Sequence, residues 1–363
     1  MSSSRIANLD GIRGIAILMV LLGHTAQNYQ PLNEVARRWL MVFANSSGGV
    51  RLFFVLSGYL ITGLLLREYP RTSTLALGNF YWRRIVRIFP AFYVFLAAVY
   101  LLSLCSPTEP SAGAWFAAAT FTWNYGFLWM TVSPALHWNL GHLWTLALEE
   151  QFYLVWPLIL LLARPRRAFW VAVALIAWCP LARVATYFIF PAERGYIGMM
   201  AHTAMDSLMV GCAVTLLMQS PAWRTKLLHA GATLAGVSTV WLLLISPVVG
   251  ELVHGFPAVA GLTLDAIAAG GVIAWVHYGS LPGVDAFLGR GLLPILGVIS
   301  YSLYLWQQLF LSPSGPLASG RVLWPWLGAL AAATASYWLV ERPTLRFKDY
   351  WVRARTAVTL PSV

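Results

Sequence analysis

Residues 10–29 read DGIRGIAILMVLLGHTAQNY, and this stretch decides the fold class. As one helix it is long enough to cross a hydrocarbon core about 30 Å thick. An apolar run so near the start of a chain can also be a secretory signal peptide, but this one contains Arg13 and His24, and no small-residue cleavage site follows it. We therefore expect residues 10–29 to form a first membrane-spanning helix.

The remainder of the chain repeats this apolar pattern. Of the 363 residues, 59% are hydrophobic and only 10% are charged, against about 25% charged in an ordinary soluble domain. We predict an all-α fold, a polytopic transmembrane helix bundle that forms a single integral membrane domain over residues 1–363 with no fused extracytoplasmic domain. About ten spans are expected, at residues 10–29, 50–66, 88–104, 142–162, 168–190, 199–218, 227–249, 258–276, 292–311 and 322–339.

One further apolar stretch, residues 112–129, has no basic residue on either side between residues 104 and 163. Because basic residues mark the cytoplasmic ends of membrane helices, nothing indicates that this stretch crosses. We interpret it as a re-entrant or interfacial segment.

The basic residues indicate the topology. A cytoplasmic N-terminus and ten crossings put both termini in the cytoplasm and place all but six of the 24 Lys and Arg residues on the cytoplasmic side, the exceptions being Arg37, Arg38, Arg51, Arg183, Arg194 and Arg321. A multi-pass protein of a cell membrane is expected.

The net charge of +11 does not indicate nucleic-acid binding, because the basic residues lie between hydrophobic segments. The three cysteines are too few and too far apart for a metal site.

Ionisable residues inside the first span are candidates for function, because a charge within a bilayer is costly. Arg13 and His24 are eleven residues apart, which returns to within about 20° of the same helical face and separates them by about 16 Å along the axis. Asp10 falls on nearly the same face. The alternative is that His24 is only a polar residue satisfied by a neighbouring helix.

A second group of polar residues opens the span at residues 142–162. His142, Glu149 and Tyr153 share one helical face at separations of seven and eleven residues. The neighbouring Glu150 is turned by about 100° and is expected to make a structural hydrogen bond. The alternative is an interfacial acidic pair that merely positions the helix.

A third group comes just before the span at residues 88–104. Arg84 and Arg87 are three residues apart, which places two guanidinium groups side by side on a helix, an arrangement suited to phosphate oxygens. The positive-inside rule alone would also explain them as topological anchors.

The order of these motifs resembles the membrane-bound acyltransferase family 3, whose members modify polysaccharides, peptidoglycan, glycolipids and macrolide sugars. The similarity covers nearly the whole chain: the opening NLDGIRG before Gly23-His24, FFVLSGYLITG at 53–63, RIVR at 84–87, the EEQFY region at 146–157 and ISYSLYLW at 299–306. Two positions depart from the family pattern. Gln307 stands where a histidine is often found, and Ala204 where an arginine is common, and neither departure is expected to affect the chemistry.

The resemblance implies an acyl-coenzyme A donor that enters from the cytoplasm, no bound cofactor, and a sugar-containing acceptor at the inner membrane of a bacterium. A sugar hydroxyl needs a base to attack a thioester, and His24 is the candidate. Glu149, or failing that Asp10, is expected to orient its ring. Arg84 and Arg87 would hold the donor phosphates and Arg13 would attract the donor. Further substrate-binding candidates are Ser57, His142, Tyr153, Tyr301 and Trp306.

The predicted function is transfer of an acyl group, in the simplest case acetyl, to a hydroxyl of the acceptor within the lipid bilayer. A transporter or flippase that uses His24, Glu149 and Asp265 as a proton relay is the alternative. No internal repeat is evident, which argues against it. The sequence leaves the oligomeric state open.

Overall fold

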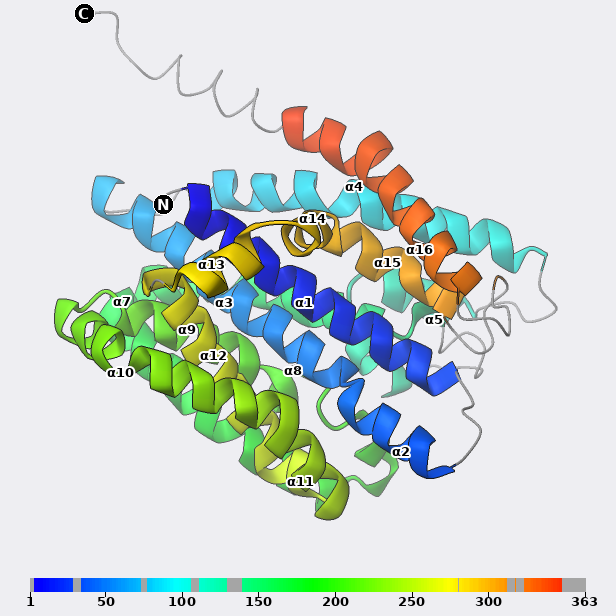
Figure 1. The fold of residues 1–363 in the computed structure, drawn as a ribbon. Coiled ribbons are helices and arrows are strands. Elements are labelled where there is room, and N and C mark those ends of the chain that lie inside the picture. The colour runs from blue at the N-terminus through cyan, green and yellow to red at the C-terminus, as the bar shows by residue number, and fades with distance from the viewer. Residues whose placement is uncertain are drawn as a thin grey trace, which may run out of the picture.

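The computed structural model describes residues 3–28, 34–72, 77–105, 111–128, 139–279, 281–311, 317 and 323–347. Every regular element in these ranges is helical (Figure 1), which confirms the predicted all-α class. Within these described ranges, six helices are long and apolar enough to cross a membrane, or up to seven if one bent pair is a single span. The protein therefore has the architecture of a helical membrane protein.

The first half of the chain contains the long helices α1, α3, α4 and α7. In chain order its elements are α1 (Ser3–Asn28), α2 (Glu34–Phe43), α3 (Ser46–Thr72), α4 (Leu77–Ser103), α5 (Ala112–Ala119), the 3₁₀ turn η1 (Trp123–Leu128), α7 (Leu143–Ile189) and the 3₁₀ turn η2 (Pro191–Tyr196).

The second half is more broken. Its elements are α8 (Ala201–Ala204), α9 (Asp206–Leu217), α10 (Pro221–Val240), the π-helix η3 (Trp241–Ile245), α11 (Ser246–Leu252), the π-helix η4 (Pro257–Gly261), α12 (Leu262–Tyr278), α13 (Pro282–Gly289), α14 (Leu292–Val298), α15 (Ser300–Leu311), α16 (Leu323–Ser336) and the π-helix η5 (Tyr337–Glu341).

Two of the expected spans lie in α7, which consists of two helices separated by a kink. The predicted spans 142–162 and 168–190 both fall in α7, whose 47 residues would measure about 70 Å as one rod, far more than a bilayer core. Arg164 interrupts α7 with a φ of 60° and a ψ of 159°, immediately before Pro165. This break separates the two apolar halves at the place where the sequence predicts a loop.

Other expected spans are shorter or bent in the structure. Residues 199–218 form α8 and the 12-residue α9 instead of one long helix. Residues 292–311 form α14 and α15, which meet at 83°, and α16 has only 14 residues. The count of ten crossings is therefore not reproduced by helix length alone, because hydropathy along the sequence does not detect such breaks. Residues 112–128 form two short helices, neither long enough to cross.

Close backbone contact holds the central helices together. Gly58 of α3 lies against the backbone of Leu208 in α9, and Gly211 of α9 lies against the backbone of Val55, so that a Cβ at either glycine would collide. Because two helices can approach this closely only where small residues meet, these glycines fix α3 on α9. The adjacent Ser57 is thereby held at a defined position in the bundle.

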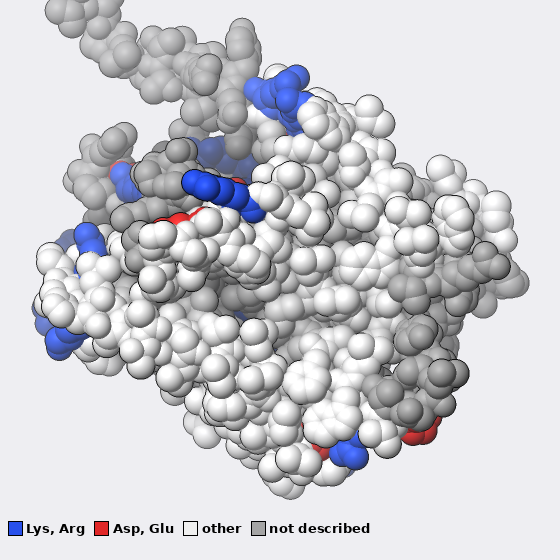
Figure 2. Space-filling view, viewed as in Figure 1, with Lys and Arg blue, Asp and Glu red and all other residues white. Residues whose placement is uncertain are grey.

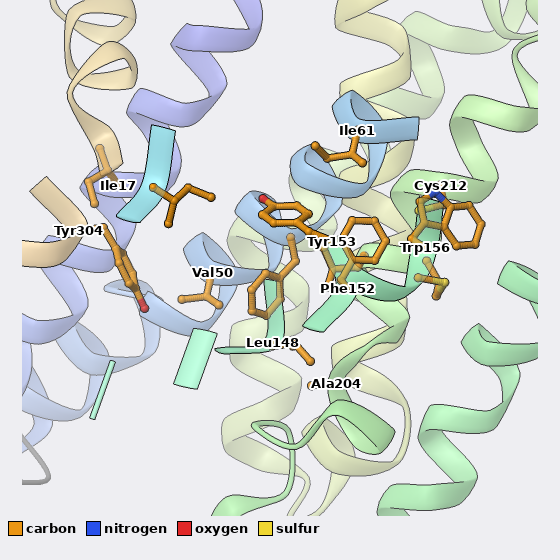
Figure 3. Packing of buried hydrophobic residues seen from close by; sticks show 14 of the residues in the cluster. Ile17, Val50, Ile61, Leu148, Phe152, Tyr153, Trp156, Ala204, Cys212 and Tyr304 are labelled. Carbon is orange, nitrogen blue, oxygen red and sulfur yellow. The ribbon is translucent and has the colours of Figure 1, made fainter. Parts of the chain in front are cut away.

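The core is aromatic and aliphatic, and the outer surface is largely uncharged. Phe152, Tyr153 and Trp156 of α7 pack with Ile61 of α3 and Cys212 of α9 (Figure 3). On the face in Figure 2, charged side chains gather at two opposite ends and leave a wide uncharged band between them. Such a band is the surface that a lipid bilayer covers.

Candidate functional site

Three cavities lie one after another through the helix bundle. We name them the basic cavity, of about 790 Å³, the central cavity, of about 110 Å³, and the histidine cavity, of about 480 Å³. The basic and central cavities share Arg13, Arg84 and Arg87, and the central and histidine cavities share Val50 and Tyr304. Because each neighbouring pair has common walls, the three form a series.

The basic cavity is lined by arginines from several helices. Arg13 comes from α1 and Arg84 and Arg87 from α4, and Arg67 and Arg224 complete the set. Arg13 donates from Nη1 to Asp10 Oδ1 at 2.9 Å, so one of these cations is partly neutralised. Arg84 and Arg87 each line both the basic and the central cavity. An excess of guanidinium groups over carboxylates makes this cavity suited to a polyanion.

The central cavity contains a compact hydrogen-bonded group. Ser57 Oγ donates to Glu149 Oε1 at 2.8 Å and lies 3.0 Å from the hydroxyl of Tyr153, which in turn donates to Glu149 Oε2 at 3.2 Å. The Arg84 guanidinium lies 5.1 Å from the centre of the Tyr153 ring. Both carboxylate oxygens of Glu149 are thus occupied by hydroxyl donors, and the group forms one rigid wall beside the arginines.

Tyr301 supports the same cavity from α15. It lines the central cavity and its hydroxyl donates to the carbonyl of Ile88 in α4 at 2.8 Å. The bond ties the late helix to the helix that carries the arginine pair. The predicted residues Ser57, Arg84, Arg87, Glu149, Tyr153 and Tyr301 are therefore brought together in one place.

The histidine cavity contains His24 near the far end of α1. His24 Nδ1 lies 2.8 Å from Gln307 Oε1. With the amide oriented in this way, the oxygen can only accept, so the ring donates its Nδ1–H and keeps the lone pair of Nε2. Among the described residues Nε2 has no hydrogen-bond partner. The ring is therefore in the tautomer that a general base requires.

A second histidine is held in the same way by the next residue of α15. His142 Nδ1 lies 2.7 Å from Gln308 Oε1, and the His142 backbone N–H also donates to that oxygen. Thr145 donates to the Tyr304 hydroxyl at 2.7 Å and that hydroxyl donates to the His142 carbonyl. Successive glutamines of one helix thus fix two imidazoles, both of which line the histidine cavity.

The prediction that Glu149 or Asp10 orients the ring of His24 was wrong. Glu149 lies in the wall of the central cavity with Ser57 and Tyr153, and Asp10 pairs with Arg13. Helical phase places residues on a face of their own helix, but it does not identify the neighbouring helix. Gln307, which was not expected to affect the chemistry, is the residue that contacts His24.

Two more candidates are placed differently from the prediction. His142 precedes α7, which begins at Leu143, and it lines a different cavity from Glu149 and Tyr153. Trp306 packs edge-on against Phe95 at 5.7 Å between ring centres, and it does not line any of the three cavities. A position two residues away on a helix points in another direction, which separates Trp306 from Tyr304.

The sequence prediction missed Gln308, Tyr304 and Arg51, all of which line the histidine cavity, and gave Gln307 no role. The adjacent amides of Gln307 and Gln308 inside an apolar helix could have indicated such a site from the sequence, because buried amides need hydrogen-bond partners.

In the described part of the chain, no group of three or more His, Cys, Asp or Glu side chains is arranged to hold a metal ion.

Comparison with known proteins identifies the family of this chain. The profile of a family described as an acyltransferase domain matches residues 6–341. The chain is 32% identical over 322 residues to the O-acetyltransferase OatA of Staphylococcus aureus (strain NCTC 8325 / PS 47), an alignment that covers 82% of this chain and 49% of the relative. It is 27% identical over 367 residues to the putative peptidoglycan O-acetyltransferase YrhL of Bacillus subtilis (strain 168), covering 93% and 54%.

The chain spans about half the length of the curated relatives it matches. No solved structure shows significant similarity to it. The matched range extends over nearly all of the helix bundle and includes every residue of the three cavities. The chain therefore belongs to the acyltransferase 3 family, as its motifs predict, and residues 6–341 form an acyltransferase domain.

Proposed function

We propose that this protein is an integral membrane O-acyltransferase that moves an acyl group, in the simplest case acetyl, from acyl-coenzyme A to a hydroxyl of a sugar-containing acceptor. The observation that carries the proposal is the series of three cavities, which leads from a cluster of arginines to His24, whose Nε2 has no hydrogen-bond partner among the described residues. The two curated relatives are named as O-acetyltransferases, which supports the same reaction class.

The basic cavity is the proposed donor site. Coenzyme A carries several phosphate charges, and charge-assisted bonds from guanidinium forks are the strongest available to them. The same arginines belong to the loops and helix ends that the positive-inside rule assigns to the cytoplasm, where acyl-coenzyme A is found. From there the thioester arm would enter the central cavity between Arg87 and Tyr304.

The histidine cavity is the proposed acceptor site. His24 Nε2 would take the proton of the acceptor hydroxyl as its oxygen forms a bond to the acyl carbon. The carbon–sulfur bond of the thioester then breaks, and the proton passes from the imidazolium to the departing thiolate, so that atoms and charge balance. Gln307 keeps the ring in the required tautomer throughout.

The acceptor would approach from the opposite side of the membrane to the donor. Transfer would then modify a cell-surface polysaccharide, a glycolipid or a macrolide sugar at the cytoplasmic membrane of a bacterium. The name of the Bacillus relative specifies peptidoglycan, and a glycan on the outer side would meet the histidine cavity first. No nucleic acid has a part in the reaction.

The transporter alternative has less support. A proton relay needs its members within reach of one another, but His24 and Glu149 line different cavities. Asp265 lies elsewhere, where its Oδ1 accepts from Trp241 Nε1 at 2.9 Å. The observed bonds hold each of these groups in a separate position.

The test is transfer of a labelled acyl group by purified protein in vesicles, with His24→Ala as the variant. We expect the loss of general-base catalysis to lower the rate by about 10²–10⁴-fold with the protein still inserted. The matched control is His229→Ala, because His229 is exposed on α10 and bonds only to the carbonyl of Thr225. Transfer by His24→Ala at a rate near that of His229→Ala would overturn the proposal.

A further inference from the structure

One buried cation that lines the histidine cavity has no ion-pair partner among the described residues. Arg51 of α3 is 4% exposed and its Nη2 donates to the carbonyl of Gly198 at 3.3 Å. Its Nε and Nη1 atoms are buried and have no hydrogen-bond partner among the described residues. Arg51 lines the cavity that contains His24, and no Asp or Glu is among the described residues that line that cavity.

A second buried arginine shows how the same bundle satisfies a structural guanidinium. Arg183 of α7 is fully buried, and each of its nitrogens is bonded: Nε to the Ala258 carbonyl, Nη1 to the Thr203 carbonyl and to Asp206, and Nη2 to Thr263. Its ion pair with Asp206 has a length of 2.9 Å. Arg183 therefore needs nothing from outside the protein.

The carboxylates nearest to Arg51 are already used. Asp206 accepts from Arg183 and from Thr263 on Oδ2 and from the Ser207 backbone on Oδ1. Asp265 accepts from Trp241. Neither forms an ion pair with Arg51 within the described residues, so two nitrogens of its guanidinium, Nε and Nη1, are left without an acceptor there.

An unpaired charge in this position is costly, and a buried polar group without a partner calls for an explanation. A bound ligand that provides hydrogen-bond acceptors for Arg51 would explain why the protein keeps this arginine. The backbone is shaped for the cation, because Gly198 has a φ of +98° and a Cβ there would lie 3.3 Å from Arg51 Nη2. Gly198 thus lets its carbonyl meet one end of the guanidinium, while Nε and Nη1 have no acceptor among the described residues.

We propose that Arg51 is an anion-binding residue of the histidine cavity, which takes an oxyanion, a carboxylate or a phosphate, carried by the molecule whose hydroxyl meets His24. The inference rests on the proposed function for the identity of that molecule as the acceptor. It narrows the acceptor to an acidic glycan or a sugar linked to phosphate. A cavity of about 480 Å³ has room for a sugar ring together with such a group.

The test is a binding measurement without any acyl donor, so that it does not depend on catalysis. Full-length purified protein in phosphatidylcholine nanodiscs is heated with one of three probes: methyl glucuronide, glucose 1-phosphate or the neutral methyl glucoside. A ligand that binds only the folded state raises the unfolding temperature in proportion to the logarithm of its concentration over Kd. We expect at least one anionic probe to bind tenfold or more tightly than the glucoside.

The variant is Arg51→Met, which keeps an unbranched side chain that can pack in place of the arginine stem and removes the charge. We expect the affinity for the anionic probe to fall about tenfold or more, as the loss of charge-assisted hydrogen bonds requires, with the weak affinity for the glucoside unchanged. The control is Arg38→Met, because Arg38 is an exposed arginine paired with Glu251 and does not line the cavity. It should bind all probes as the wild type does.

A preference for the glucuronide identifies a carboxylate and a preference for the phosphate ester identifies a phosphate, and either supports the proposal. Equal binding of the anionic and neutral probes to the wild type would overturn it, as would undiminished anion binding by Arg51→Met. If that variant does not fold, Arg51→Lys and Arg51→Gln are compared, with the lysine variant expected to bind the anion more tightly and equal binding contradicting the proposal. Failure of acyl transfer in the His24 experiment would leave these results unaffected.

Discussion

The Nδ1 atom of His24 lies 2.8 Å from the Oε1 atom of Gln307, although the two residues are 283 positions apart in the sequence. This contact joins α1 to α15 and orients the imidazole in the histidine cavity. A carboxylate partner would add a full charge beside the ring, whereas an amide supplies a fixed acceptor only. Gln307 is therefore a positioning residue, and its effect is on the tautomer and direction of His24.

Gln307→Leu should lower kcat about tenfold or more and leave the donor KM near its normal value. Leucine offers no acceptor, so Nδ1–H loses its partner and the ring is no longer held in one tautomer. Gln307→Glu keeps an oxygen acceptor at the same length and should recover most of the loss. Steady-state kinetics at equal concentrations of folded protein measure both. Equal damage by the two substitutions would show that Gln307 contributes only packing.

Replacing Arg84 and Arg87 together by glutamine should raise the apparent KM for acyl-coenzyme A by at least tenfold. Each lost contact between a guanidinium and a phosphate costs about 1.5–3 kcal/mol, and the acceptor site is in another cavity. The acceptor KM should change little.

Arg83→Gln is the matched control for this pair. Arg83 adjoins Arg84 in the sequence, but it bonds to Glu68 and does not line the basic cavity. Its donor KM should stay within about twofold of the wild type, because exposed and rim ion pairs contribute about 0–1 kcal/mol. If all three arginine substitutions reduce only the amount of inserted protein, the arginines are topological anchors.

Glu149→Gln should reduce kcat/KM more than Glu150→Gln. The Glu149 carboxylate accepts from both Ser57 and Tyr153, and an amide can accept on one of its two positions only. Glu150 makes no such bond within the described residues and does not line the three cavities. Similar losses in the two variants, or a larger loss in the Glu150 variant, would contradict this assignment.

Ser57→Ala tests the same contact from the other side. In a double-mutant cycle with Glu149→Gln, we expect a coupling free energy of about 1 kcal/mol or more, because the two side chains share one hydrogen bond. Strictly additive effects would mean that the Ser57–Glu149 bond does not contribute to transfer.

Arg183→Met should destabilise the protein by about 3–5 kcal/mol, since it leaves the Asp206 carboxylate buried without a counter-charge. Adding Asp206→Asn should restore part of that stability by removing the isolated charge. Arg51→Met, in contrast, should leave the stability of the ligand-free protein unchanged or raised, because only one long bond to Gly198 is lost. The unfolding temperatures of the three variants in nanodiscs check this ordering.

Part of the candidate site could be read directly from the sequence. The family motifs identified Ser57, Glu149 and Tyr153, and the structure brings these three side chains within hydrogen-bonding distance of one another. The pairing of Arg84 with Arg87 followed from helical spacing because both residues lie on one helix, α4. Contacts of this kind depend on local geometry, which a sequence specifies well.

The sequence by itself determined the all-helical class, the membrane environment and the family, because hydropathy and short motifs are properties of contiguous residues. It did not determine that α14 and α15 meet at 83°, or that Glu149 and His24 line separate cavities. Only the tertiary structure decided those features, because they depend on which helices are neighbours and how far each is rotated about its axis. The same reason explains why only the folded bundle reveals the positions of Gln307 and Arg51. The residues around each of them come from segments far away in the chain.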